Sequence, residues 1–159
     1  MTLELGLKTY DSKDVLISIN NFPLLSGFSD DKITVEFDND SYTHKSDVDG
    51  KLVVRDRNND QSATVTLYVM QKSSVNDILN TFLQADKINN KGVFQFTMSE
   101  LNGADIIQTS FAYILKPPSM SKGKESGVHE WTIKIPKPNV KYGAGLTPSI
   151  TIAPPLPGV

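Results

Sequence analysis

Apolar and polar residues alternate along six stretches of this 159-residue sequence, and no other feature restricts the fold as much. In residues 63–70, ATVTLYVM, every second residue from Ala63 to Val69 is apolar. A period of two is typical of β-strands that have one buried and one polar face. The other stretches are residues 15–19, 33–37, 94–98, 105–115 and 128–135. Their short links favour antiparallel pairing, so the sequence predicts a mainly β protein with a β-sandwich or barrel.

The alternation is least regular in residues 105–115. There we expect the heavier apolar side chains to form the buried face: Ile107, Phe111, Tyr113 and Leu115. Residues 128–135 alternate more clearly, and Trp131 lies on their apolar face. Because the apolar face of a strand is the one that packs inward, we expect Trp131 in the core.

One stretch, from about residue 74 to residue 87, has the period of an α-helix instead. Its apolar residues are spaced i, i+3, i+4 and i+7, which indicates a single buried stripe: Val75, Ile78, Leu79 and Phe82. Ser74 stands where an N-cap belongs, and Asp77 stands where the acidic residue of a capping box belongs. The segment NNKG at 89–92 is expected to end the helix. The stripe packs either on the sheet or on a neighbouring subunit.

The segment from about residue 38 to residue 60 is polar and dense in charge. It has an Asp49-Gly50 turn between two arms that resemble short strands, so we expect a long protruding β-hairpin. The segment has too few apolar residues to form a core of its own. We therefore expect it to be ordered by a partner, through strand pairing and side-chain contacts.

Prolines are concentrated in the last 24 residues of the sequence: Pro136, Pro138, Pro148, Pro154, Pro155 and Pro157. Proline has no backbone N–H to donate to a sheet and favours extended chain. The sequence therefore predicts one β domain over residues 1–135, followed by a proline-rich arm over residues 136–159.

Composition excludes several classes of function. The net charge is −2, whereas proteins that bind nucleic acid by neutralising phosphates carry a basic excess. The sequence has no cysteine, which excludes disulfides and thiolate metal sites. We expect no membrane insertion and no cleaved signal peptide, because no apolar run approaches about 20 residues and the first residues lack a basic flank.

No arrangement of residues indicates catalysis. His44 and His129 are the only histidines, and neither lies near a serine and carboxylate pattern of the kind that a triad needs. The lysines near residue 123 lack the spacing of a phosphate-binding loop. We therefore expect a protein without enzymatic activity and without a cofactor.

The acidic residues of the expected hairpin match a calcium-binding loop only in part. Aligning Gly50 with the glycine of an EF-hand places Asp47 and Asp49 at ligand positions. The first ligand position is then Lys45, which repels the ion, and the flanking segments resemble strands rather than helices. A solvated turn explains these residues better than a metal site does.

The order of several sequence blocks resembles tail tube proteins of tailed bacteriophages, most of all a short group found mainly in contractile-tailed phages. The blocks are DGKLVVRDRNNDQSATVTLYVMQKSSVNDIL at 49–79, LNG at 101–103, KPP at 116–118 and GKESGVHEWTIKI at 123–135. In that group a glycine hairpin leads through an R-x-R-N-N-like segment into T-V-T-L-x-x-M-Q, and a helix beginning S-x-N-D-x-L follows. The resemblance extends from about Asp14 to Ile135.

The resemblance implies a structural protein of the virion tail, assembled in the host cytoplasm. Six subunits would form a ring whose inner sheets join into one barrel, and the rings would stack into a tube through which DNA passes without specific binding. It further implies sheath, tape measure and baseplate or tail-terminator proteins as partners. The strand at residues 63–71 would then supply one face to the core of the domain and the other face to the wall of the tube. Contacts between rings are expected from the hairpin residues: Tyr42, His44, Lys51, Val53, Arg55 and Arg57.

A second interpretation from another class is a carbohydrate- or calcium-binding β-sandwich module of a virion or surface protein. Such a module needs exposed aromatic side chains beside paired acids. The expected burial of Trp131 argues against it.

Overall fold

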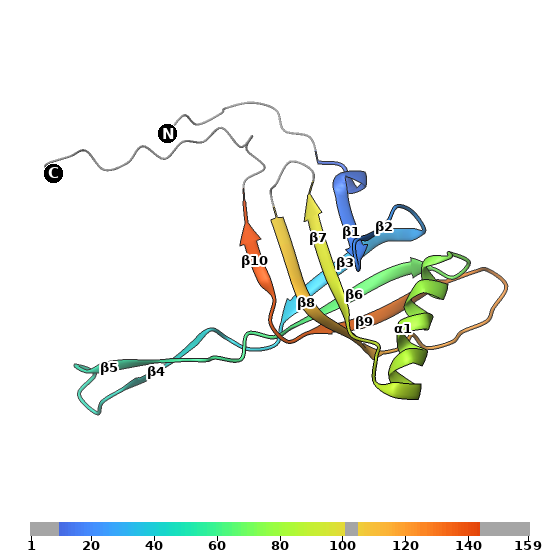
Figure 1. Ribbon diagram of the computed structural model, residues 1–159. Helices are drawn as coiled ribbons and strands as arrows, with labels where there is room; N and C mark the ends of the chain where they lie inside the picture. Colours follow the sequence, from blue (N-terminus) through green and yellow to red (C-terminus); the bar gives the residue numbers. More distant parts are fainter. Residues whose placement is uncertain (1–9, 101–104, 144–159) are drawn as a thin grey trace, which may run out of the picture.

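The computed structural model describes residues 10–100 and 105–143. Within these two ranges, ten strands, one short 3-10 helix and one α-helix form a β-rich body from which a hairpin extends (Figure 1). The elements are η1 (Ser12–Asp14), β1 (Val15–Ile19), β2 (Phe22–Leu24), β3 (Phe28–Phe37), β4 (Tyr42–Ser46), β5 (Val53–Arg57), β6 (Ala63–Met70), α1 (Val75–Asn89), β7 (Phe94–Glu100), β8 (Asp105–Lys116), β9 (Val128–Ile135) and β10 (Asn139–Tyr142).

Eight of these strands form one continuous antiparallel system with the order β2-β1-β7-β8-β9-β6-β3, and β10 pairs with β8. The 12-residue strand β8 joins the two layers. Its residues from Ile106 to Ala112 pair with β7, and its residues from Tyr113 to Lys116 pair with β9. The layers β2-β1-β7-β8-β10 and β8-β9-β6-β3 enclose the core between them. The mainly β fold predicted from the sequence is confirmed.

The core is built by the alternation that the sequence displays. In β6, Ala63, Val65, Leu67 and Val69 are completely buried, while the threonines between them are partly exposed. Residues of β9 lie opposite them in register, among them Trp131 beside Leu67 and Ile133 beside Val65. Each fully buried valine, leucine or isoleucine side chain of this kind contributes about 1.5–3 kcal/mol, so this strand pair is a major source of stability.

The buried face expected for residues 105–115 is confirmed only at Ile107 and is wrong for the later residues of the strand. Ile107 is buried, but Phe111 and Leu115 are exposed and Tyr113 is only partly buried, whereas Ala112 and Ile114 point inward. The reason is a β-bulge, because two residues lie between Thr109 and Ala112 whereas only one lies between their partners Phe96 and Phe94. One extra residue moves every later side chain to the opposite face. The Thr109 hydroxyl accepts a hydrogen bond from the backbone N–H of Phe111 at 3.1 Å and stabilises the bulge.

The helix α1 packs on the sheet of its own chain. Val75 and Leu79 are buried in the core, and Ile78 and Phe82 pack against it. The Phe82 ring lies 4.8 Å, centroid to centroid, from the ring of Phe94 in β7. The helix starts at Val75 and ends at Asn89, where residues 74–87 were expected.

The expected capping box is not formed. Ser74 already has helical backbone angles, and its side chain makes no capping hydrogen bond. A residue in that conformation cannot direct its hydroxyl back to the free N–H groups of the first turn. The preceding residue does this instead, since the Ser73 hydroxyl accepts from the N–H of Val75 at 3.2 Å.

The expected boundary at residue 135 lies just before β10. Pro136 and Pro138 precede this strand, but Asn139–Tyr142 contain no proline, so their N–H groups are available to pair with β8. The rest of the expected proline-rich arm, residues 144–159, lies outside the described residues. None of the helices in the described ranges has the length and hydropathy needed to cross a membrane.

Candidate assembly surfaces

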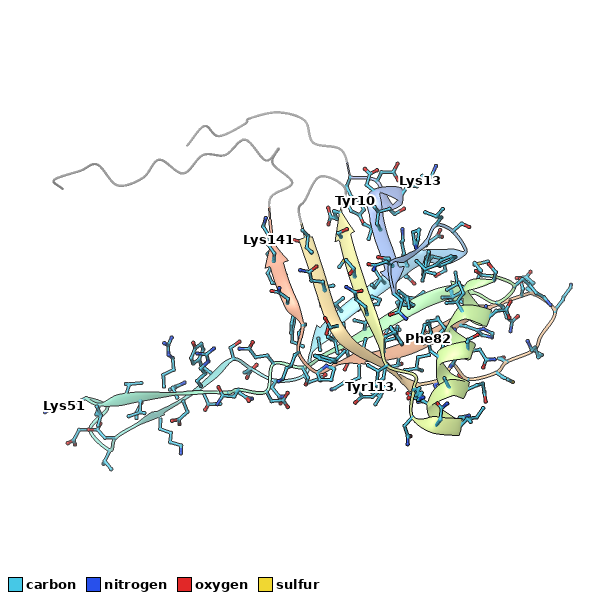
Figure 2. All side chains as sticks on the ribbon, viewed as in Figure 1. Tyr10, Lys13, Lys51, Phe82, Tyr113 and Lys141 are labelled. Atoms are coloured by element: carbon cyan, nitrogen blue, oxygen red, sulfur yellow. The ribbon has the colours of Figure 1, made fainter. Side chains whose placement is uncertain are left out.

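The hairpin formed by β4 and β5 is a two-stranded sheet of its own, separate from the main strand system. All ten residues of its strands are exposed. It extends away from the body, and its side chains point into solvent on both sides, with Lys51 at the tip (Figure 2). A two-stranded hairpin without a packed face is marginally stable in water, and no other element of the described residues covers either face of this one.

The register of the hairpin sorts its side chains into two different faces. Tyr42 lies opposite Arg57, His44 opposite Arg55, and Ser46 opposite Val53. Directly opposed residues of an antiparallel pair share a face, so these six side chains lie together. The other face holds Thr43, Lys45, Val54 and Asp56.

We call the first of these the cationic face: Tyr42, His44, Ser46, Val53, Arg55 and Arg57. It has two arginines and no carboxylate, and the Arg55 guanidinium lies 4.0 Å from the centre of the Tyr42 ring. The only ion pair within residues 10–100 and 105–143 is Lys134 with Asp38, so neither arginine is neutralised there. Five of the six expected interface residues lie on this face, whereas Lys51 belongs to the loop at the tip.

The loop at the tip is ordered by its own hydrogen bonds. The Asp47 carboxylate accepts from the N–H of Lys51 at 2.8 Å, and the Asp47 N–H donates to the Leu52 carbonyl at 2.9 Å. Gly50 has a φ of +71°, which an L-residue with a side chain adopts only with strain. The Asp49-Gly50 turn expected from the sequence is therefore present, with Asp47 holding it closed.

The base of the hairpin is fixed to the body by a network around Asp38. This carboxylate accepts from the hydroxyls of Ser62 at 2.9 Å and Thr64 at 2.8 Å, and it is paired with the Lys134 ammonium. The hydrogen bond from Lys134, followed by that from Thr64, holds the pKa of Asp38 below its usual range. A second contact at the base runs from the Asn39 amide to the Asp60 carboxylate at 3.2 Å. The base is thus fixed while the arms are free.

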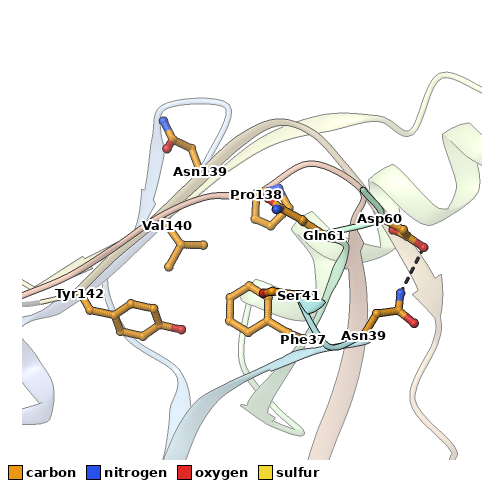
Figure 3. A pocket seen from close by; sticks show the side chains of 9 residues that line it. All are labelled: Phe37, Asn39, Ser41, Asp60, Gln61, Pro138, Asn139, Val140 and Tyr142. Atoms are coloured by element: carbon orange, nitrogen blue, oxygen red, sulfur yellow. Dashed lines mark hydrogen bonds between the residues drawn. The ribbon is translucent and has the colours of Figure 1, made fainter. Parts of the chain in front are cut away.

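A hollow of about 410 Å³ lies beside this base (Figure 3). It is bordered by the edge strands β3 and β10, with Phe37 from β3 and Val140 and Tyr142 from β10 among its lining residues. A neighbouring hollow of about 210 Å³ is lined by Ile33 and Val35, again from β3. The sequence interpretation missed β10 and these hollows, although the apolar Val140 and Tyr142 alternate with polar residues. Both edge strands retain one side for further pairing.

The polar face of β3, β6 and β9 is rich in threonine. Thr66 lies between Thr34 and Thr132 in one cross-strand row, and Thr64 lies between Glu36 and Lys134 in the next. This face has few charges, and both signs are present. It can border water or a passing polyanion without a strong field of either sign.

The two histidines take no part in a catalytic arrangement. His44 is exposed on the cationic face, and His129 Nδ1 lies 3.0 Å from Asn76 Oδ1. Trp131 is 4% exposed and donates from Nε1 to the same Asn76 oxygen, so its ring is not available to stack on a sugar. Over the ranges that the structure describes, no cluster of three or more His, Cys, Asp or Glu is suited to hold a metal ion.

Comparison with protein families gives a match over most of the chain. The family described as the bacteriophage PhiTE tail tube protein matches residues 9–143 of the chain. No curated protein sequence matches this chain.

Comparison with solved structures gives the same fold at low identity. The tube-terminating cap of the anti-feeding prophage superposes with a TM-score of 0.59 at 12% identity, covering 88% of this chain and 96% of that one. A chain of the PVC sheath-tube complex of an extracellular contractile injection system, in its extended state, has a TM-score of 0.56 at 14% identity, with 84% and 92% covered. A chain from the virion of a native gene transfer agent has a TM-score of 0.56 at 16% identity, with 86% and 100% covered.

Proposed function

Since the chain belongs to the family of the bacteriophage PhiTE tail tube protein, we propose that it builds the tube of a phage or phage-like tail as stacked hexameric rings around a channel for DNA. A structural role in the tube follows from the family. The ring of six and the passage of DNA are our extension of it. The chain acts by assembly and not as an enzyme.

The observation that carries the proposal is the hairpin. Its ten strand residues are exposed on both faces although the strands are regularly paired and the loop is hydrogen-bonded. An element of this kind gains buried surface only from another molecule. In a stack of rings, the hairpin of each subunit reaches the next ring, which makes Tyr42, His44, Lys51, Val53, Arg55 and Arg57 the residues of that contact.

The edge strands β3 and β10 supply the contacts within a ring. Within each subunit, β3 and β10 border the two hollows described above. Pairing or packing of β3 of one subunit beside β10 of its neighbour would cover these hollows and close the sheets into a barrel. A closed barrel leaves no free edge, which removes a source of uncontrolled aggregation.

The threonine-rich face of β3, β6 and β9 is then the wall of the channel. Duplex DNA carries one charge about every 1.7 Å, and a basic wall would hold it by releasing counterions. A face with both signs and mostly neutral hydroxyls lets DNA slide. This agrees with the net charge of −2.

Partners follow from the same proposal. The similar fold of a tube-terminating cap and of a chain in a sheath-tube complex supports a terminator and a sheath as partners of this tube. We extend the set to a tape measure protein inside the tube and a baseplate at its end. The assembled protein would lie in the virion tail after assembly in the host cytoplasm.

Native mass spectrometry and sedimentation velocity of the purified chain test the ring. We expect a concentration-dependent species of six subunits and larger multiples of it. A single monomeric species at all concentrations, also after addition of a tail initiator complex, would refute the proposal.

A further inference from the structure

The structure offers a partner surface for the cationic face on a second copy of the same chain. At the end of the body away from the hairpin, η1 with its N-cap residue Asp11 and the start of β3 carry four carboxylates: Asp11, Asp14, Asp30 and Asp31. We call this group the acidic corner. Lys13 and Lys32 lie among them, so four negative charges and two positive charges leave a net charge of −2.

One of the two lysines in this corner already donates to backbone carbonyls. Lys32 Nζ donates to the carbonyls of Ser12 at 2.9 Å and Val15 at 2.6 Å. Asp30 and Asp31 are exposed, and no ion pair within the described residues involves either of them. They lie in an irregular part of β3, where four residues between Phe28 and Ile33 face only one residue of β6. The irregularity places both carboxylates where a partner can reach them.

The corner also provides apolar surface. A hollow of about 390 Å³ lies there, lined by residues that include Leu16, Leu24, Leu25, Asp30 and Lys32. Leu25 is 80% exposed. On the hairpin, Val53 and the Tyr42 ring accompany the two arginines on the same face. Both surfaces therefore combine an apolar part with charges, and the charges are of opposite sign.

The positions of the two surfaces fit a stack. The hairpin leaves the body just after the end of β3, and the acidic corner is at the start of β3, so the ten-residue strand separates them (Figure 1). Figure 2 shows this separation in the positions of Lys51 at the hairpin tip and Lys13 at the corner. A contact between opposite ends of identical molecules is heterologous and repeats without limit, which a tube requires.

Resting on the proposed function, we propose that the cationic face of the hairpin docks onto the acidic corner of a subunit in the next ring. Arg55 and Arg57 pair with Asp30 and Asp31, while Tyr42 and Val53 cover the hollow beside Leu25. The base of the hairpin also has two carboxylates that form no ion pair within the described residues, Asp40 and Asp60. Docking there would join like ends and give closed pairs rather than a stack.

Charge reversal with rescue tests this contact. Arg55→Glu with Arg57→Glu should raise the protein concentration needed for tube formation at least about tenfold, because like charges then face each other across the contact. Asp30→Arg with Asp31→Arg should do the same. The chain with all four substitutions should form tubes again near the wild-type concentration.

The matched control is Lys45→Glu, which changes charge on the other face of the same hairpin and should leave the concentration within about twofold. Circular dichroism and thermal unfolding of each variant verify that the body stays folded. Assembly is measured by light scattering and electron microscopy, at low salt and at 0.5 M salt, where the Debye length is below about 10 Å and stacking should weaken.

Each of the following outcomes would overturn the proposed contact. Wild-type tubes that tolerate reversal of Asp30 and Asp31 would refute this contact while leaving the proposed function intact, whereas absence of wild-type tubes would refute the proposed function itself. Closed dimers in place of tubes would point to the base of the hairpin. Tubes unaffected by Arg55→Glu and Arg57→Glu, together with loss of binding to duplex DNA in a mobility-shift assay, would show that the cationic face serves nucleic acid instead.

Discussion

Trp131 Nε1 donates a hydrogen bond of 2.9 Å to Asn76 Oδ1, which connects the middle of β9 to the first turn of α1. The same oxygen lies 3.0 Å from His129 Nδ1, and because an indole N–H can only donate, the oxygen accepts from both rings. The Asn76 amide donates in turn to the carbonyls of Met70, Gln71 and Ser73. One side chain thus fixes the end of β6, the start of α1 and β9.

Asn76→Ala should lower the free energy of unfolding by about 1–3 kcal/mol, because the buried Trp131 N–H loses its acceptor. Asn76→Asp should destabilise the chain as well, since a carboxylate there faces three carbonyl oxygens. Chemical denaturation followed by Trp131 fluorescence measures both. Asn80→Ala, one turn along the helix on the exposed side, is the control, and an equal loss in that variant would contradict a specific role for Asn76.

Leu79 is completely buried in the stripe of α1. Leu79→Asp places an unpaired charge in the core and should cost at least about 4 kcal/mol, which leaves the chain unfolded or insoluble. Asn80→Asp adds the same charge on the neighbouring exposed position and should remain folded. The measurement is the soluble yield and the thermal transition of each variant, and an unchanged transition for Leu79→Asp would contradict the packing of the helix.

The Asp38 network predicts a dependence of stability on pH. The pKa of Asp38 is held below its usual 3.8, chiefly by the hydrogen bond from Lys134. The ionised carboxylate therefore stabilises the folded chain above pH 3.8, and this contribution is lost as the pH falls through the lower folded-state pKa. Because the pair is near the surface, Asp38→Asn should cost only about 0.2–1 kcal/mol at pH 7.

Thermal unfolding of Asp38→Asn and of the unchanged chain between pH 7 and pH 2 checks this. The difference between them should shrink below pH 3.8. Glu36→Gln, in β3 two residues before Asp38, is the control. A difference that stays constant down to pH 2 would show that the carboxylate charge is not what matters.

Alternation predicts the strands where nothing interrupts the period. It identifies β6 and β9, and it also predicts that Tyr42 and His44, or Arg55 and Arg57, share a face once they lie in strands. It fails in β8, because the bulge at Thr109 depends on the pairing with Phe96 and Phe94, residues that are distant in the sequence. It fails at β10 because Pro136 and Pro138 mark the segment as irregular although the next four residues can pair.

The acidic corner was also beyond prediction from the sequence. Asp11 and Asp14 are separated from Asp30 and Asp31 along the chain, and only the fold brings them to one end of the body. Its local signal, DD at residues 30–31, is too common to identify a surface.

Removal of the hairpin should separate folding from assembly. Replacing residues 41–57 by Gly-Ser between Asp40 and Asn58 keeps the Asp38 network and every core residue, so circular dichroism should show a folded body. Stacking should fail, because the contact between rings is lost. A variant in which only the loop residues 47–52 are replaced by Asn-Gly keeps both arms and five of the six proposed contact residues. It should still stack, but more weakly, because Lys51 is lost. Tubes of normal length from the chain without a hairpin would contradict its role as the connector.

The most direct test of the account is electron cryomicroscopy of the assemblies formed by the unchanged chain. We predict hollow tubes of stacked six-fold rings, with the polar face of β3, β6 and β9 toward the lumen and the hairpin of each subunit against the next ring. Tubes whose hairpins point freely into solvent, or particles without a lumen, would contradict it.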